Sequence, residues 1–175
     1  MNLNKYIRSI PNYPKKGILF RDVTTIFNNA NAFKYCINRI SKICKKKKIS
    51  KIAGIEARGF IIGAAVAFKL NLPFVPIRKK GKLPFKKYAQ KYKLEYGFDT
   101  LEIHKDSIKK KEKIALVDDL IATGGTAMAS KKLIIKLGGS LKLFISIVDL
   151  KDLGGSNKLR KARVEAVSLV KLPGH

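Results

Sequence analysis

The stretch IALVDDLIATGGTAMA, residues 114–129, decides the fold prediction for this sequence. Its apolar start, Ile114 to Val117, predicts a buried strand, and Thr126 to Leu137 predicts a helix that ends at two glycines. Two adjacent acids, Asp118 and Asp119, and a turn of small residues lie between them. Because ligands of open α/β sheets bind at the carboxyl ends of the strands, this strand end is a candidate binding site.

The small-residue turn has the features of a phosphate cradle. It consists of Ala122, Thr123, Gly124, Gly125 and Thr126. Its glycines let backbone N–H groups turn inward, the helix N-terminus carries partial positive charge, and the threonines add hydroxyl donors. The neighbouring carboxylates repel phosphate, so we expect them to bind hydroxyl groups or a metal. A sugar phosphate fits both halves; the alternative is a capped strand and a tight turn without function.

Strands and helices alternate along the rest of the chain, which predicts an α/β fold with a central, mainly parallel twisted sheet flanked by helices. We expect strands at 18–23, 51–55, 74–78, 141–150 and 164–170, and helices at 4–10, 30–46 and 60–70. Residues 79–93 predict a long mobile loop. A hairpin of 93–97 with 100–104 is expected after it, and residues 153–155 predict a turn. With 175 residues and no linker, we expect a single domain over 1–175.

Composition excludes several other classes of protein. The net charge is +26, but the 38 basic residues are spread through nearly every segment and only seven are arginine, which argues against specific nucleic-acid binding. No apolar run approaches the ~18 residues that span a bilayer, and the start lacks a secretory signal, so we expect a cytoplasmic protein without membrane association. Cys36 and Cys44 lie about 12 Å apart on one predicted helix, too far for a disulfide. Two histidines are too few for a zinc site.

Several motifs together resemble one enzyme family. The stretch at 114–129 resembles the phosphoribosyl pyrophosphate (PRPP) motif of the type I phosphoribosyltransferases. Further motifs are similar in order and spacing to the adenine phosphoribosyltransferase branch: FRDVT at 20–24, EARGF at 56–60, IRKKGKLP at 77–84, LEYG at 94–97, LEIH at 101–104, DLGG at 152–155 and the terminal PGH. The resemblance covers essentially the whole chain.

This resemblance implies the type I phosphoribosyltransferase fold with a mobile hood loop. The implied reaction transfers the 5-phosphoribosyl group from PRPP to adenine, forming AMP and pyrophosphate in purine salvage. It implies Mg²⁺ that is held mainly by PRPP and water, with no direct protein ligand, and a homodimer in which Arg78 or Lys82 reaches across the interface. Two alternatives remain open: another purine base as acceptor, or a PRPP-sensing RNA-binding regulator.

The resemblance also implies roles for individual residues in binding the donor. Asp118 and Asp119 would hold the ribose hydroxyls, and Ala122 to Thr126 the 5′-phosphate. Arg58, Arg78 and Lys82 would stabilise the leaving pyrophosphate; the lesser alternative for Arg58 is a surface ion pair. The peptide bond between Glu56 and Ala57 is expected to be cis.

The remaining roles concern the base. Adenine is uncharged, so we expect Phe20 to stack on it and the backbone of Leu19 and Arg21 to read its edge, although a phenylalanine on a short strand is ordinarily a core residue. Glu95 is the candidate general base that accepts the purine proton, and Tyr96 would orient the same groups. Arg58, Glu95 and Tyr96 are therefore the expected catalytic residues.

Overall fold

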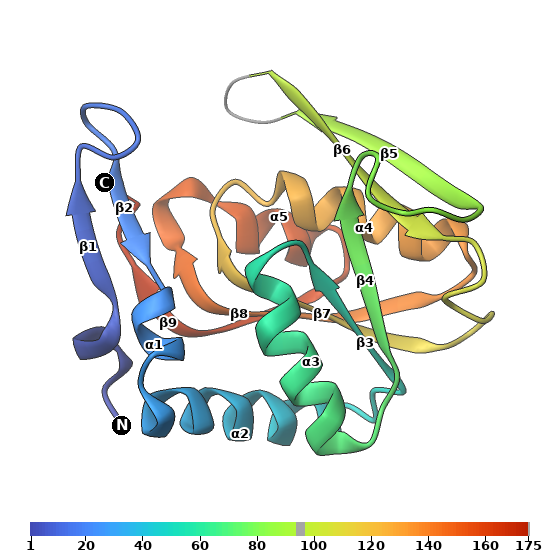
Figure 1. Cartoon of the computed structure of the whole chain (residues 1–175), viewed down its shortest axis with the longest axis horizontal. Helices are drawn as coiled ribbons and strands as arrows, with labels where there is room; N and C mark the ends of the chain where they lie inside the picture. The colour runs from blue at the N-terminus through green and yellow to red at the C-terminus, as the bar shows by residue number, and fades with distance from the viewer. Residues whose placement is uncertain (94–96, 175) are drawn as a thin grey trace.

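A twisted seven-stranded sheet forms the centre of the structure, a computed structural model that describes residues 1–93 and 97–174. The strands lie in the order β5-β6-β4-β3-β7-β8-β9 (Figure 1). The parallel strands are β3 (Lys51–Ile55), β4 (Phe74–Lys79), β7 (Lys113–Ile121), β8 (Ser140–Leu150) and β9 (Glu165–Leu172). The predicted α/β class with a mainly parallel sheet is confirmed.

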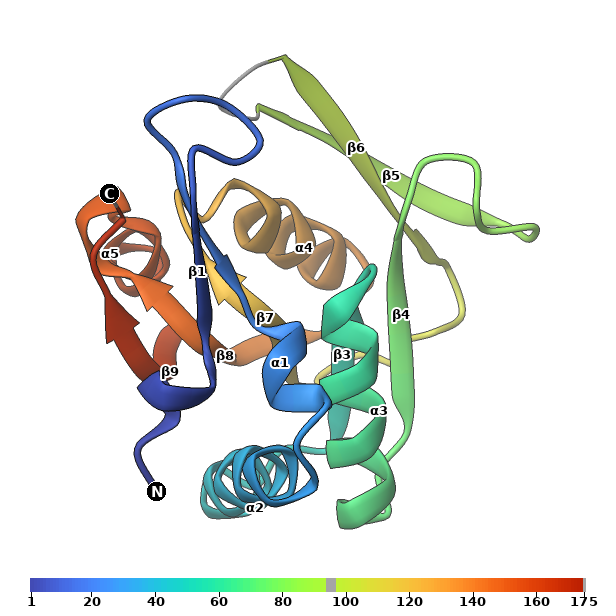
Figure 2. The same ribbon diagram turned by 60° about the vertical axis from the view of Figure 1, so that its left-hand side comes forward.

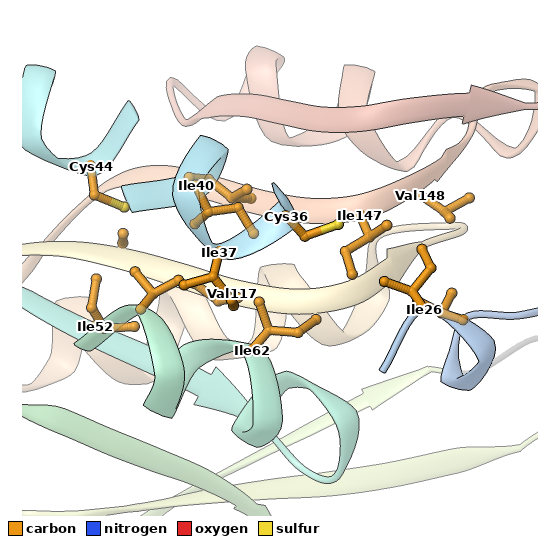
Figure 3. Close-up of a cluster of buried hydrophobic side chains, with 14 of the residues drawn as sticks. Ile26, Cys36, Ile37, Ile40, Cys44, Ile52, Ile62, Val117, Ile147 and Val148 are labelled. Atoms are coloured by element: carbon orange, nitrogen blue, oxygen red, sulfur yellow. The ribbon is translucent and has the colours of Figure 1, made fainter. Parts of the chain in front are cut away.

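Helices cover both faces of this sheet (Figure 2). The helices are α2 (Ala30–Lys46) and α3 (Arg58–Leu70) on one face, and α4 (Gly125–Lys136) and α5 (Gly155–Lys161) on the other. In the first apolar layer, Ile37 and Ile40 of α2 pack near Ile62 of α3 and Val117 of β7 (Figure 3). Burial of β7 and β8 on both faces explains their continuous apolar sequences.

The two cysteines belong to this apolar layer (Figure 3). Both are free thiols, as their spacing predicted. Burial raises the pKa of Cys36 to about 11 and that of Cys44 to about 12, so both remain protonated near neutral pH. They act as small apolar side chains in the core.

β7 is longer than predicted, and its extra residues create a binding edge. The predicted strand ended at Val117, whereas β7 continues through both acids to Ile121. Pairing with β3 ends at Gly54 opposite Val117, but pairing with β8 continues to Ile121. Asp118 and Asp119 therefore lie just beyond the last contact with β3, while hydrogen bonds to β8 still hold their backbone.

The N-terminal prediction was wrong. Residues 4–10 do not form a helix: a short 3-10 helix, η1 (Leu3–Tyr6), precedes β1 (Arg8–Pro11), which pairs antiparallel with β2 (Leu19–Asp22). These strands form a second, two-stranded sheet, and a short helix, α1 (Thr24–Phe27), follows them. A helix of seven residues is marginally stable by itself. Pairing with β2 instead gives the backbone of β1 hydrogen-bond partners.

The prediction of a loop over 79–93 was wrong for its second half. β5 (Lys87–Lys93) pairs antiparallel with β6 (Phe98–His104), from Lys87 opposite His104 to Lys93 opposite Phe98, so the predicted hairpin register was also wrong. Tyr88 and Tyr92, on the same face of the strand, pack β5 onto the apolar cluster that includes α4. We call the β5–β6 hairpin the hood; its mobility stays a prediction.

The predicted turn at 153–155 is a short 3-10 helix, η2 (Lys151–Leu153), that leads into α5, which was not predicted. No helix in the described part of the chain is long and apolar enough to cross a bilayer.

Candidate active site

A cleft of about 410 Å³ opens at the carboxyl ends of β3 and β7. Its size lies in the range of small-ligand sites, roughly 300–1,000 Å³. The lining comes from the turn after β3, from β7, from the start of α4 and from the hood: Ile55, Glu56, Ala57, Arg58, Lys79, Tyr92, Asp99, Leu101, Asp118, Asp119, Leu120 and Thr126. The structure thus brings together the motif at 114–129 and the EARGF motif.

The two motif acids lie in the cleft with Arg58 beside them. Arg58 Nε donates to Asp119 Oδ2 at 2.5 Å, and the carboxylate of Asp119 is only 7% exposed. The backbone N–H of Asp119 donates to Asp118 Oδ1 at 3.0 Å. Burial and the adjacent charge of Asp119 raise the pKa of Asp118 well above its ordinary value. A crowded, desolvated pair of this kind binds hydroxyl donors readily and excludes a further anion.

The phosphate cradle forms a smaller cavity of about 140 Å³ next to the cleft. Residues 120–127 line it together with Asp118 and Phe144, so it shares Asp118, Leu120 and Thr126 with the cleft. Gly124 has a left-handed φ of +74°, which turns the chain into the N-terminus of α4. Unsatisfied N–H groups at that helix end favour an anion.

The unpredicted helix α5 supports this cradle from outside. The Gly155 N–H donates to the Ala122 carbonyl at 2.9 Å. A Cβ on Gly155 would lie 2.3 Å from Ala122 O and 2.7 Å from Gly124 N, so only glycine fits. DLGG therefore has a structural role in the site that its composition alone did not indicate.

The turn after β3 approaches the acids closely. The Glu56–Ala57 peptide bond is cis, as the resemblance implied. A Cβ on Gly59 would lie 2.6 Å from Val117 O and 3.1 Å from Asp118 Oδ1. Glycine at this position is what allows the turn to place Arg58 against the carboxylates.

Glu56 connects this turn to the two other predicted pyrophosphate-binding residues. Its carboxylate accepts hydrogen bonds from Lys82 Nζ at 2.8 Å, Arg78 Nη2 at 3.3 Å and the Lys79 N–H at 3.0 Å. Burial opposes ionisation, but these donors outweigh it and lower the pKa of Glu56 to about 2. Arg78 and Lys82 do not line the cleft themselves; they reach it through Glu56.

The predicted adenine-binding residues lie on β2, outside the lining of the cleft. Leu19, Phe20 and Arg21 are all partly buried, and the Phe20 ring meets Tyr13 edge-on with 5.2 Å between centroids. The Arg21 guanidinium donates to Ser9 Oγ at 2.5 Å and to Pro173 O at 3.4 Å.

The end of β2 is close to the cleft through Asp22. Hydrogen bonds from Thr24 and the positive charges of Arg8 and Arg58 lower the pKa of Asp22. Arg58 therefore lies near enough to Asp22 for their charges to interact.

The hood contributes residues that the sequence analysis missed. Tyr92 Oη donates to Asp99 Oδ2 at 3.3 Å, and Lys79 Nζ lies 3.1 Å from the same oxygen. Burial raises the pKa of Tyr92. The available signal was Tyr88 and Tyr92, which share one face of a strand, but they lie in a segment that was interpreted as a loop. The predicted catalytic residues Glu95 and Tyr96 lie outside the described residues.

Comparison with known proteins points to one family. Residues 22–163 match the phosphoribosyl transferase domain family. The chain is 50% identical over 175 residues to an adenine phosphoribosyltransferase of Pelagibacter ubique, covering 100% of both chains. The crystal structure of adenine phosphoribosyltransferase from Thermoanaerobacter pseudethanolicus superposes with a TM-score of 0.92 at 45% identity, covering 97% of this chain and 98% of the other. The Saccharomyces cerevisiae adenine phosphoribosyltransferase, complexed with an imino-altritol bisphosphate and adenine, gives a TM-score of 0.90 at 36% identity over 96% of each chain.

Proposed function

The chain belongs to the phosphoribosyltransferase family, and from this premise we propose that its cleft transfers the 5-phosphoribosyl group from PRPP to adenine, forming AMP and pyrophosphate. The reaction belongs to purine salvage and makes the chain a pentosyl-transferring glycosyltransferase. One observation carries the proposal: a pair of adjacent acids, suited to sugar hydroxyls and with Asp119 buried, lies directly beside a cradle suited to a phosphate. Similar adenine-acting relatives support adenine over another purine and over an RNA-binding regulator.

We propose that the donor binds along β7. Asp118 and Asp119 accept hydrogen bonds from the ribose hydroxyls, and the backbone and hydroxyl groups of 122–126 hold the 5′-phosphate. This orientation directs the pyrophosphate toward the 56–58 turn. Arg58 stabilises the charge that grows on pyrophosphate as the glycosidic bond breaks, with Arg78 and Lys82 as further cations. The short distances around Asp119 and Glu56 support this arrangement.

For adenine we propose the binding residues that the family resemblance implies. Phe20 stacks on adenine, and the backbone of Leu19 and Arg21 reads its edge. Glu95 accepts the purine proton while Tyr96 orients the reacting groups, and the hood excludes water that competes for the ribosyl carbon. The hood is held at the cleft by two contacts to the Asp99 carboxylate, one from Lys79 and one from Tyr92.

We propose that Mg²⁺ enters with PRPP. Among residues 1–93 and 97–174, no three His, Cys, Asp or Glu side chains gather into a group that could hold a metal ion. Oxygen ligands from the substrate and water suit Mg²⁺, which dehydrates reluctantly. Asp118 and Asp119 are the nearest carboxylates, and the bound ion would neutralise part of the pyrophosphate charge.

We also propose a homodimer that uses the outer face of α3. Ile61, Ala64 and Phe68 lie on that face at helical spacing, and Phe68 is 91% exposed. A helix that is apolar on both sides is normally covered. Because α3 starts at Arg58, this interface adjoins the pyrophosphate end of the cleft. A single domain over 1–175 and a cytoplasmic location stay predictions.

The test is a PRPP-dependent assay with adenine, hypoxanthine, guanine and xanthine in parallel. We expect AMP and pyrophosphate in equal amounts from adenine with Mg²⁺ present. Asp118→Asn should remove turnover, whereas Asp106→Asn, a matched change at an exposed acid, should leave it unchanged. Preference for another base would overturn the assigned acceptor, and retained PRPP affinity in Asp118→Asn would overturn the assigned donor site.

A further inference from the structure

Glu56 holds both additional cations of the proposed pyrophosphate site on one carboxylate. The carboxylate is 10% exposed and accepts from Lys82 Nζ at 2.8 Å and from Arg78 Nε and Nη2 at 3.4 and 3.3 Å. The Lys79 N–H adds a bond of 3.0 Å. Two positive side chains therefore share a single negative partner, with an uncharged donor as the fourth contact.

The two cations are attached to Glu56 in different ways. Arg78 reaches it through two nitrogens, donates with its third to the Lys82 carbonyl at 2.9 Å, and is 33% exposed. Lys82 has one contact to Glu56 through its ammonium group and is 50% exposed. A planar guanidinium fixed by three contacts is held in place, whereas an ammonium on a flexible stem exchanges partners easily.

We propose that Glu56 is a positioning residue that keeps Lys82 in a resting ion pair. When ligand binds, the Lys82 ammonium group leaves Glu56 and pairs with the pyrophosphate moiety instead. The inference rests on the proposed function, because it takes pyrophosphate as the anion. Glu56 retains Arg78 and the Lys79 N–H after the exchange, so its buried carboxylate keeps charged and uncharged donors. Pyrophosphate carries more negative charge than one carboxylate and therefore competes successfully.

The exchange has a consequence for the product. Each pyrophosphate that binds Lys82 must first break the Glu56–Lys82 pair, and the pair re-forms when pyrophosphate leaves. Glu56 therefore weakens the hold on pyrophosphate and assists its release. A purely structural Glu56 would affect stability without this selective effect on one ligand.

The experiment measures pyrophosphate affinity by calorimetry for wild type, Glu56→Gln, Lys82→Met and the double variant. Pyrophosphate must break the partly exposed Glu56–Lys82 pair in wild type but not in Glu56→Gln. We therefore expect the variant to bind pyrophosphate about two- to fivefold more tightly. The gain should vanish in the Lys82→Met background, and the KM for adenine should not change. The matched control is Glu165→Gln, which removes an exposed pair with Lys47 Nζ, 2.6 Å away at the other end of the strands.

Equal or weaker pyrophosphate binding by a folded Glu56→Gln, or a gain that survives Lys82→Met, would overturn the inference. A second measurement needs no change at Glu56: the ¹⁵N signal of the Lys82 ammonium, assigned by its loss in Lys82→Met, should shift when wild type is saturated with pyrophosphate. An unshifted signal would overturn the exchange. Wild type that forms AMP but gives these negative results refutes only the exchange, whereas wild type without AMP formation refutes the proposed function and the exchange with it.

Discussion

Arg58 and Asp119 form an ion pair across the cleft, joining the turn after β3 to the end of β7 through Arg58 Nε and Asp119 Oδ2. The pair connects a residue proposed to bind pyrophosphate with one proposed to bind ribose. Glu56, two residues before Arg58, forms a second ion pair with Lys82. If both proposals hold, donor binding would replace these internal ionic contacts with ligand contacts.

Replacing Arg58 by Gln should weaken PRPP binding and also destabilise the fold. The change leaves the carboxylate of Asp119, which is 7% exposed, without its charged partner. Since the arginine is partly exposed, we expect a loss of about 1 kcal/mol in the free energy of unfolding at neutral pH. Urea unfolding and PRPP titration measure the two effects. Arg39→Gln, at an exposed position on α2, is the control; equal effects of both changes would contradict the assignment.

Asp118→Asn should stabilise the protein while removing activity. Burial and Asp119 raise the pKa of Asp118 above 3.8, so the native carboxyl keeps its proton to higher pH than the unfolded one. Ionising it costs stability as pH rises through that window, and the amide removes the cost. We expect a higher Tm at neutral pH, by roughly 2–4 °C for each kcal/mol regained. The difference should shrink as the pH falls toward about 4. A lower Tm of the variant at neutral pH would show that ionised Asp118 does not destabilise the fold.

Glu56 should make the protein acid-sensitive in a defined range. Its pKa falls from 4.5 to about 2 in the fold, so its contribution to stability is complete above the higher value and is lost as pH drops toward the lower one. Wild type should be more stable than Glu56→Gln at neutral pH, and the two should converge on acidification within this range. Urea unfolding at a series of pH values measures the difference. A constant gap between the two proteins would contradict the hydrogen-bonded carboxylate described above.

Phe68→Glu should convert the proposed dimer to a monomer. The ring is 91% exposed on the outer face of α3, so the substitution removes no described core contact and should leave the monomer folded. Sedimentation equilibrium measures the mass, and circular dichroism checks the fold. Ile135→Glu, at an exposed position of α4, is the matched control and should remain dimeric. A monomeric wild type, or dissociation by the control alone, would place any interface elsewhere.

The sequence predicted those parts of the fold that depend on local periodicity. The bounds of α2 and β3 agree with the prediction because Asn29 caps a regular amphipathic helix and because β3 is apolar after Lys51 and buried throughout. Strand β5 was missed because it is basic and exposed on one side, and only its pairing with β6 makes it a strand. Local composition could not reveal that pairing, since the partner residues lie up to 17 positions away, as for Lys87 and His104.

The candidate site divides in the same way. Asp118, Asp119 and 122–126 are adjacent in sequence, so a single stretch revealed them. The attachment of Arg78 and Lys82 to Glu56 depends on the neighbouring positions of β3 and β4 and on the loop after β4. The resemblance named these cations, but only the folded chain shows that Glu56 is their shared partner. The support that Gly155 gives to Ala122 likewise joins residues from different strand ends.

Gly155→Ala should damage the phosphate cradle, although Gly155 itself is not proposed to contact the ligand. The new Cβ would meet Ala122 O at 2.3 Å and Ile121 Cγ1 at 2.8 Å, so backbone of the cradle must move. Overpacking of this kind costs about 1–3 kcal/mol, and we expect the KM for PRPP to rise about tenfold with a smaller change for adenine. Steady-state kinetics with each substrate varied in turn measure the difference.

Gly154→Ala provides the contrast for this prediction. Gly154 has a φ of +74° but nothing within 4 Å of its Cβ position, so alanine there introduces backbone strain without a collision. It should lower the Tm and leave the KM for PRPP near the wild-type value, because the cradle keeps its contact with Gly155. If both substitutions raise the KM equally, strain in the loop before α5 is the cause; if only Gly155→Ala does, the close approach of α5 to Ala122 positions the phosphate-binding turn.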